Sequence, residues 1–367
     1  MLDFPFREAS GKARPLLVGG VKVARGETRQ VNLDFSETYL GTPVSVPVYV
    51  LRAPKPGPRV FLAATIHGDE LNGLGILREL LYDKPPALTR GTIVIVPVVN
   101  VYGIEDHTRY LPDRRDLNRS FPGSSEGSIS SRLANVFFKE VVSQCDLGID
   151  FHTAALRRTN FPNIRADMTN EGTRKIARAF GVELIVHGKG PAGSLRREAT
   201  NAGTPTVILE AGEVWKIEPM VVEIGVRGIL NVLKALGMVD GDPVRPLFQV
   251  AVKATTWVRA ERGGLLNFHA RPGDLVREGE SLATNSSIFG EQHRELLSPA
   301  DGIVIGMTTM PAVKPGEPVY HIAKLARNTH RRIKSDVESV SSTYVYNRIQ
   351  EALATNIVVR ERDNGTS

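Results

Sequence analysis

The segment RVFLAATIHGDELNG, residues 59–73, predicts a strand followed directly by a turn and a helix. Residues 60–66 are apolar and partly β-branched, which is typical of a buried strand, and a Gly-containing turn ends that strand at His67. Leucines at helical spacing over residues 70–82 then predict a helix. An imidazole at His67 and a carboxylate at Glu70 could hold a metal, but a hydrogen-bonded turn is the more ordinary explanation of that pair.

Two further predicted strands also end in polar side chains. Residues 146–151 predict a strand that ends in His152, and the strand over residues 205–209 ends in Glu210. Ligands bind at the carboxyl ends of strands in open α/β sheets, so these side chains would meet the 67–70 turn if the strands are parallel neighbours. Considered alone, His152 could be an ordinary core histidine, and Glu210 could be a carboxylate at a helix N-terminus or one paired with an Arg. Burying several charged groups without a compensating ion is costly, so the three placements together favour a metal.

Two imidazoles and one carboxylate, with an open position for water, are the ligand set of a hydrolytic zinc site. A fourth acidic group that does not bind the metal can serve as general base for that water.

Strands alternate with helices over about 200 residues, which predicts an α/β domain with a largely parallel or mixed sheet flanked by helices. Alternating polar and apolar stretches before residue 58 predict antiparallel strands that lead into it. Residues 100–131 form a long loop rich in Gly, Pro, Arg, Asp and Ser, which indicates function more than a linker. The other expected elements are strands at 92–99 and 182–186, helices at 129–143, 173–180 and 219–236, and a short amphipathic piece at 195–201.

After Gly237 the chain changes to short β-rich runs separated by Gly turns. Two similar units, RPGDLVREGESLA and VKPGEPVYHIA, predict a small all-β domain of the barrel-sandwich, lipoyl-like kind. Its expected hairpin, NSSIFGEQH, contains no Lys, so we reject a role as cofactor carrier. We therefore expect a β-rich lead-in at 1–58, an α/β hydrolase domain at 59–240, a small β domain at 246–325, and a peripheral helix with a loose tail at 326–367.

Composition narrows the class of protein further. The net charge of +6 and the pI of about 9.4 raise the possibility of nucleic acid, but no RNA-binding aromatic motif or zinc-finger spacing accompanies them. A field that attracts small anionic substrates explains the charge equally well. No stretch approaches the roughly 20 apolar residues of a membrane span. The first residues lack the apolar core of a signal peptide and Cys145 is the single cysteine, so we expect a cytoplasmic protein and leave a homo-oligomer open.

The motifs HGDE, DLNRSFPG, DFHT and LEAG together resemble the succinylglutamate desuccinylase and aspartoacylase family, relatives of the zinc carboxypeptidases. The resemblance spans about residues 59–237, and the β-rich region after it fits the family's small C-terminal domain. It implies one Zn²⁺ per chain, bound by His67, Glu70 and His152. It also implies that Glu210 takes a proton from the zinc-activated water and returns it to the leaving amine.

The resemblance also implies an anion-binding loop. Asn118 and Arg119 match the family's Asn-Arg pair and would hold a substrate carboxylate, a task that suits the planar guanidinium fork. Arg109 is the candidate for stabilising the oxyanion. The segment TRYLPDRRDLNR is slightly longer than in aspartoacylases proper, so Arg114 and Arg115 stay alternatives, and Arg115 is also a candidate for substrate binding.

Other polar residues receive lesser roles. Arg197 and its neighbour Arg196 are candidates for a second carboxylate, although solvated charge on a short helix explains them more simply. We expect Asp116 to orient an Arg and Asp69 to orient His67. The remaining histidines are expected to be structural or at the surface, with His269 and His293 the first exceptions if the small domain leans over the site: His107, His187, His269, His293, His321 and His330.

The sequence therefore predicts a zinc-dependent hydrolase that cleaves the amide bond of an N-acyl amino acid or a similar small anionic carboxylate. A zinc carboxypeptidase acting on a peptide or a modified protein C-terminus is the alternative enzyme. A binding protein that keeps the fold without the chemistry is the alternative outside catalysis. The small β domain favours the deacylase, because it narrows access in aspartoacylase relatives. Succinylglutamate, acetylaspartate and acetyldiaminobutyrate all stay open as substrates.

Overall fold

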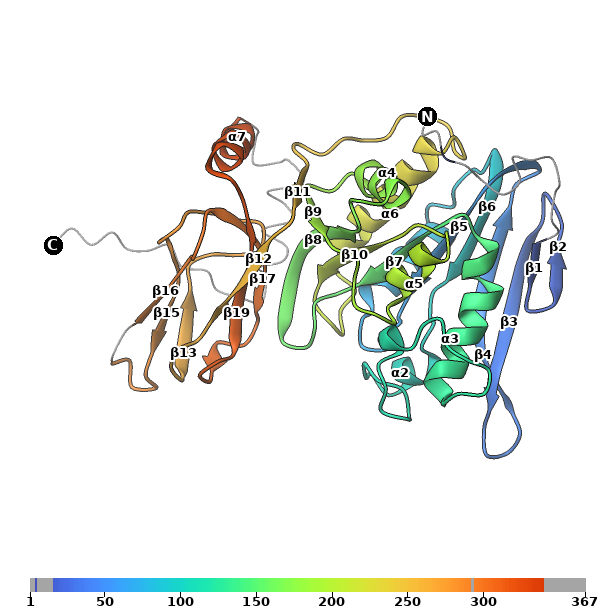
Figure 1. Cartoon of the computed structure of the whole chain (residues 1–367), viewed down its shortest axis with the longest axis horizontal. Coiled ribbons are helices and arrows are strands. Elements are labelled where there is room, and N and C mark those ends of the chain that lie inside the picture. Colours follow the sequence, from blue (N-terminus) through green and yellow to red (C-terminus); the bar gives the residue numbers. More distant parts are fainter. Residues whose placement is uncertain (1–3, 5–15, 292–293, 340–367) are drawn as a thin grey trace.

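A sheet of thirteen strands runs across the whole molecule (Figure 1). The structure is a computed structural model, and it describes residue 4 and residues 16–291 and 294–339. Four parallel strands form the centre of the sheet, in the spatial order β10, β7, β5, β6. They are β5 (Lys55–Ala64), β6 (Arg90–Val96), β7 (Leu147–His152) and β10 (Thr206–Gly212).

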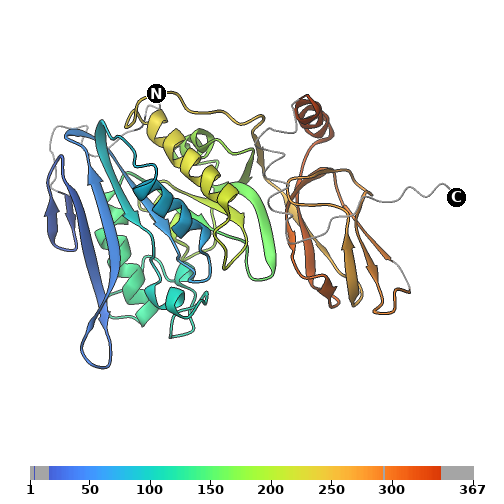
Figure 2. The ribbon, with the colours of Figure 1, turned by 180° about the vertical axis from the view of Figure 1, so that it is seen from behind.

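Side chains of the central strands point alternately to the two faces of the sheet, as pleating requires. On β5, Val60 and Leu62 enter one hydrophobic core, whereas Phe61 and Ala63 enter the other. The first core is covered by α1 (Asn72–Tyr82), α4 (Glu171–Phe180) and α6 (Pro219–Ala235). The second is covered by α3 (Ile129–Glu140) and α5 (Leu195–Asn201). Figure 2 shows α1 and α6 side by side across their face of the sheet.

Antiparallel strands extend the sheet at the N-terminal side. β4 (Pro43–Arg52) pairs with β6, and β3 (Thr28–Glu37) pairs with β4 to form the edge. β1 (Leu16–Val18) and β2 (Val21–Val23) form a separate two-stranded sheet beside them. The antiparallel lead-in that the alternating sequence predicts is therefore confirmed over the described residues.

One strand near the centre of the sheet was not predicted. β8 (Arg158–Ala166) pairs antiparallel with β10 and parallel with β9 (Leu184–His187), and β11 (Val250–Val252) pairs with β9. The sequence of β8, RTNFPNIRA, carries Pro162 and several polar residues, and a proline within a run argues against a strand. Three polar residues of this strand, Arg158, Asn160 and Arg165, line a cavity.

The small β region is joined to the main sheet. β17 (Gly302–Thr308) pairs with β8, and β19 (Pro318–Lys324), β12 (Thr255–Arg259) and β14 (Leu275–Val276) continue from it. A four-stranded sheet lies opposite, made of β16 (Arg294–Leu297), β15 (Ser281–Ser286), β13 (Gly264–Phe268) and β18 (Ala312–Val313). Apolar side chains of both layers, Tyr320 and Phe268 among them, share a third core. The predicted fold class is confirmed: a mixed sheet flanked by helices, with a small C-terminal β domain.

The expected hairpin between β15 and β16 is present, and its turn spans residues 287–290. α7 (Arg327–Glu338) is the predicted peripheral helix, whereas the predicted tail from residue 340 lies outside the described residues. The long loop of residues 100–131 holds α2 (Val101–Glu105) and the 3₁₀ turn η2 (Leu117–Arg119), and a second 3₁₀ turn, η3 (Val142–Gln144), precedes β7. Among the described helices, none has both the length and the apolar character needed to cross a membrane.

Candidate functional site

His67, Glu70 and His152 meet at the carboxyl ends of β5 and β7. One ligand atom of each lies within 4.8 Å of the others, and the three side chains are 2–4% exposed. His152 is the last residue of β7, and His67 follows β5 after Thr65, whose φ of 56° is in the left-handed region. Such strain at a β-branched residue is costly and is concentrated at functional sites, and here it lies in the turn that positions His67.

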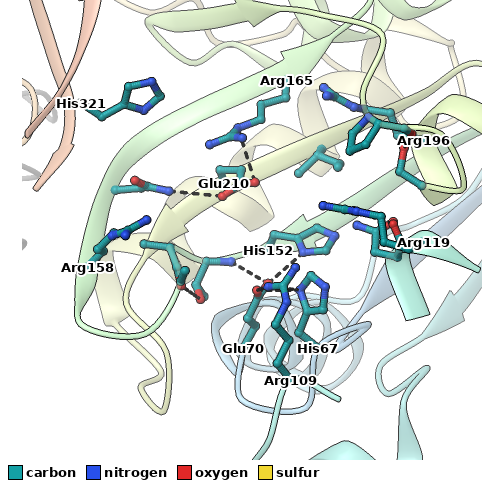
Figure 3. A pocket seen from close by; sticks show the side chains of 18 of the residues that line it. His67, Glu70, Arg109, Arg119, His152, Arg158, Arg165, Arg196, Glu210 and His321 are labelled. Atoms are coloured by element: carbon teal, nitrogen blue, oxygen red, sulfur yellow. Dashed lines mark hydrogen bonds and ion pairs between the residues drawn. The ribbon is translucent and has the colours of Figure 1, made fainter. Parts of the chain in front are cut away.

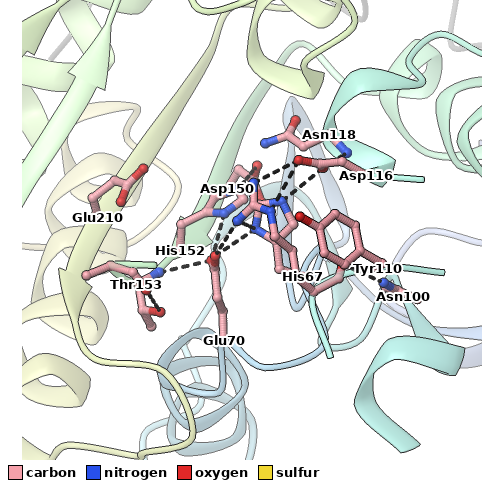
Figure 4. A network of polar contacts seen from close by, with 12 residues as sticks. His67, Glu70, Asn100, Tyr110, Asp116, Asn118, Asp150, His152, Thr153 and Glu210 are labelled. Carbon is pink, nitrogen blue, oxygen red and sulfur yellow. Dashed lines mark hydrogen bonds and ion pairs between the residues drawn. The ribbon is translucent and has the colours of Figure 1, made fainter. Parts of the chain in front are cut away.

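Glu70 connects the two imidazoles (Figure 4). Its Oε1 lies 2.7 Å from Nδ1 of His67, and its Oε2 lies 2.8 Å from Nδ1 of His152. The backbone N–H of Thr153 donates to Oε2 at 3.0 Å. Both Nδ1 atoms therefore face the same carboxylate, which is an arrangement of N and O donors suited to a divalent metal.

Each imidazole has a second carboxylate on its far nitrogen. Nε2 of His67 lies 3.1 Å from Oδ1 of Asp116, and Nε2 of His152 lies 2.7 Å from Oδ2 of the fully buried Asp150. Carboxylates in this position fix the tautomer and orientation of metal-binding histidines. The prediction that Asp69 orients His67 is wrong, because Asp116 occupies that position. Asp150 was missed, although it stands two residues before His152 on one strand and so shares its face.

The electrostatics of this cluster favour bound positive charge. Burial alone would raise the pKa of Glu70, but the two imidazoles beside it bring that pKa well below its ordinary value. Burial would lower the pKa of His152, whereas Asp150 and Glu70 raise it well above the ordinary value. Burial would also lower the pKa of His67, but Glu70 and Asp116 beside it raise that pKa above its ordinary value. Buried carboxylates thus favour positive charge at the imidazoles, and a bound metal would supply such charge.

Arg109 reaches this cluster from the long loop. Its Nη2 and Nε donate to Oδ2 of Asp116 at 2.8 and 3.3 Å, and its Nη1 lies 3.5 Å from Oε1 of Glu70. Burial would lower the pKa of Arg109, but Asp116 and Glu70 raise it. The prediction that Asp116 orients an Arg is confirmed. Of the alternatives for this position, Arg114 and Arg115 are exposed and do not line the cavity beside the cluster.

A cavity of about 260 Å³ lies beside the candidate metal group (Figure 3). Glu210 projects into it from β10, in register with His152 on the parallel neighbour β7. Nδ2 of Asn160 donates to Oε2 of Glu210 at 3.2 Å, and Nε of Arg165 lies 3.4 Å from Oε1. The expectation that the three strand ends are parallel neighbours and meet is confirmed.

The cavity is rich in cationic side chains. Arg109 is paired with Asp116 and Arg165 with Glu210. The lining arginines come from the long loop, β8 and α5: Arg109, Arg119, Arg158, Arg165 and Arg196. Glu70 and Glu210 are the carboxylates of the lining. The wall therefore carries more positive than negative groups before any metal is counted.

Asn118 and Arg119 both line the cavity. Oδ1 of Asn118 accepts the backbone N–H of Leu195 at 2.8 Å, which ties η2 to the start of α5. Arg119 donates from Nη1 to the carbonyl of Asn118 at 2.6 Å.

Of the two adjacent arginines on α5, Arg196 lines the cavity and Arg197 does not. Arg197 instead donates to the carbonyl of Gly190 at 3.3 Å. Arg196 is 8% exposed, and within the described part of the chain its Nε and Nη1 have no hydrogen-bond partner. Burial, reinforced by Arg165, lowers its pKa to about 10. A buried guanidinium with open donors needs an anionic partner.

The small β domain contributes Trp257 and His321 to the cavity. His321, which was expected to be structural or at the surface, thus lies in the lining of the cavity. Of the two histidines expected to approach the site, His269 is bonded to Oγ1 of Thr284 at 2.7 Å and does not line the cavity. The other, His293, lies outside the described residues.

Comparison with known proteins gives consistent matches. Residues 56–236 match the model of the succinylglutamate desuccinylase/aspartoacylase catalytic domain. The chain is similar to N-alpha-acetyl-L-2,4-diaminobutyric acid deacetylase of Halomonas elongata, with 27% identity over 302 residues that cover 78% of this chain and 87% of the relative.

Solved structures match over much of the chain. A succinylglutamate desuccinylase/aspartoacylase from Rhodobacter sphaeroides has a TM-score of 0.71 and 27% identity, covering 82% of this chain and 96% of that one. The apo ectoine utilization protein EutE from Ruegeria pomeroyi has a TM-score of 0.66 and 25% identity, covering 77% of this chain and 91% of that one.

Proposed function

The chain belongs to the succinylglutamate desuccinylase/aspartoacylase family, whose catalytic domain matches residues 56–236, and we propose that it is a zinc-dependent deacylase of small N-acyl amino acids. The family resemblance that the sequence motifs indicate is thereby confirmed, and with it a hydrolase of the deacylase type. The observation that carries the finer proposal is the meeting of His67, Glu70 and His152 beside Glu210 in one cavity.

The donor set fits zinc. His67, Glu70 and His152 offer two imidazole nitrogens and a carboxylate, which is a ligand set of catalytic zinc sites. Asp116 and Asp150 hold the far nitrogens of the two imidazoles, as carboxylates do around metal-binding histidines. When bound, zinc would polarise the amide carbonyl and lower the pKa of a water ligand to about 7.

Glu210 is the proposed general base and acid. Its carboxylate takes the proton of the attacking water and passes it to the nitrogen of the leaving amine. Asn160 and Arg165 hold its two oxygens in the cavity, which limits the orientations it can adopt. Arg109 is the proposed donor to the oxygen that gains negative charge, since it lines the cavity and already lies against Glu70.

Asn118, Arg119 and Arg196 are the proposed contacts for carboxylates of the substrate. Leu195 occupies Oδ1 of Asn118, which leaves the amide nitrogen as its donor to a ligand. Arg196 carries open donors on a buried side chain, so it replaces Arg197 as our candidate for a second carboxylate. Arg115 has no role in this scheme, because it is exposed and outside the lining.

The size and charge of the cavity limit the class of substrate that it can bind. About 260 Å³ is below the roughly 300–1,000 Å³ of typical ligand pockets, which favours a single acylated amino acid over the longer peptide of a carboxypeptidase. Arg119, Arg158 and Arg196 line it without an ion pair to a carboxylate among the described residues. We therefore favour an acidic N-acyl amino acid over one with a cationic side chain, such as the compound named for the Halomonas deacetylase.

A comparison of substrates on zinc-loaded protein tests this function. The set is N-acetyl-aspartate, N-succinyl-glutamate, N-acetyl-2,4-diaminobutyrate and a dipeptide with a free carboxyl end. We expect release of the amino acid from an acidic N-acyl compound, loss of that activity with a chelator, and slower cleavage of the diaminobutyrate compound and the dipeptide. Cleavage of the dipeptide alone would establish the carboxypeptidase alternative, and no cleavage of any compound would refute the deacylase.

A further inference from the structure

The side of the cavity away from Arg119 and Arg196 is aromatic. Trp257 on β12 and His321 on β19 are direct partners across the two antiparallel strands, so both side chains leave the same face of the sheet. Their ring centroids are 4.3 Å apart and their planes differ by 4°, which is a parallel stack. Both rings line the cavity.

Arg158 adds a third planar group from the other domain. Its Cζ lies 5.0 Å from the centroid of the Trp257 ring, within the range of a cation–π contact. Burial and the nearby Arg259 lower its pKa, and no ion pair joins it to a carboxylate in the described part of the chain. We call Trp257, His321 and Arg158 together the stacked wall.

Packing between the two domains does not by itself explain the stacked wall, because part of it is exposed. Trp257 keeps 36% of its surface exposed, although a large aromatic ring used only for packing is normally covered. Burial, together with Arg165 and Arg158, lowers the pKa of His321 to about 4, so its ring is uncharged near neutral pH. The stacked wall thus offers the flat faces of its side chains beside the catalytic groups. The uncharged ring of His321 adds no further positive charge to the cavity.

Glu210 divides the cavity, as Figure 3 shows, with Arg119 and Arg196 on one side and Arg158 and His321 on the other. In the proposed function, Asn118 and Arg119 hold the carboxylate of the amino acid. The opposite side then receives the acyl group, because the scissile amide lies between the two.

We propose that the stacked wall selects the acyl group of the substrate, and that the preferred acyl group ends in a planar aromatic ring. This inference rests on the proposed function, and it assigns the specificity for the acyl group to two residues of the small β domain. A ring of the substrate extends the stack of indole, imidazole and guanidinium, whereas an acetyl group has no flat surface to offer. Cationic side chains beside the stacked wall also attract the face of an aromatic ring.

The test compares acyl groups on a single amino acid. N-benzoyl-, N-succinyl- and N-acetyl-glutamate are given to zinc-loaded protein, and kcat/KM is measured for each. We expect the benzoyl compound to exceed the acetyl compound by about tenfold, the scale of one aromatic stack. In Trp257→Leu, that preference should fall to about one, and circular dichroism and zinc content matching wild type report that the variant folds. Phe289→Leu is the matched control, since Phe289 is an exposed aromatic of the same small domain, away from the cavity, and should leave the preference intact.

Binding separates this inference from the proposed function. In Glu210→Gln protein, calorimetry should give about tenfold tighter binding of benzoyl- than of acetyl-glutamate, and the added change Trp257→Leu should remove the difference. Equal binding of the two compounds, or an unchanged preference in Trp257→Leu, would overturn the inference. Selective binding without cleavage of any compound by the zinc-loaded wild type would refute the proposed function and leave the binding preference established.

Discussion

Replacing Asp150 with Asn should weaken zinc binding by about 10- to 100-fold, which corresponds to about 1.4–2.8 kcal/mol. Asp150 is fully buried and its Oδ2 lies 2.7 Å from Nε2 of His152, so it accepts the proton on that nitrogen and turns Nδ1 toward Glu70. Asn has nearly the same shape but no charge. The predicted loss agrees with the roughly 1.5–3 kcal/mol expected for a hydrogen bond to a charged group.

The assay is competition with a chelator of known affinity at about pH 8, where fewer protons compete for the imidazoles. Asp146→Asn is the control, because Asp146 is buried just before the same strand and accepts the N–H of Arg59 at 2.8 Å, at the end away from the site. Asp146→Asn should lose stability in denaturant without losing zinc affinity. Equal zinc affinity in Asp150→Asn and wild type would refute the role given to Asp150.

Three further predictions address the base, the buried arginine and a buried acid. Glu210→Gln should keep its zinc and lose about 10²- to 10⁴-fold in kcat, and a smaller loss would exclude Glu210 as the base. Arg196→Met should lower kcat/KM by at least about tenfold, mainly through KM, whereas Arg197→Met should change it less than about twofold; equal effects would contradict the assignment. Burial raises the pKa of Glu183 from 4.5 to about 7, so its stabilising contribution is complete below about pH 4.5 and is lost as the pH rises through about 7. Glu183→Gln should therefore gain up to about 3 kcal/mol over wild type between those pH values in denaturant titrations, and a constant difference would contradict the shift.

The sequence predicted the arrangement of the central strands well because it depends on local patterns. Apolar runs that end in His67, His152 and Glu210 predict buried strands, and buried strands joined by helices are parallel, so their carboxyl ends share an edge. The same reasoning could have found Asp150, which shares a face with His152.

The rest of the cavity depends on contacts that local patterns do not encode. β8 was missed because Pro162 and its polar residues argue against a strand, and with it the positions of Arg158, Asn160 and Arg165 were missed. Choosing among the arginines of the long loop required the path of that loop, which turns Arg109 toward Asp116 and leaves Arg115 exposed.

His321 and Trp257 could not be assigned to the site from the sequence. They lie far along the chain from the catalytic strands, within a region whose pattern predicts only a small β domain. They reach the cavity because β17 pairs with β8 and carries β19 and β12 alongside. That pairing between distant segments is a tertiary feature, and a histidine on a short β-strand gives no sign of it.

Zinc binding by wild type and His67→Ala tests the central claim most directly. His67 supplies one of the ligand nitrogens and lies in the turn after β5, so its truncation should remove the metal while the strand before it still folds. Zinc content after dialysis, with circular dichroism to establish the fold, should give about one zinc per wild-type chain and none in the variant. Zinc retained by His67→Ala at wild-type affinity, or wild-type protein that takes up no zinc, would contradict the proposed metal site.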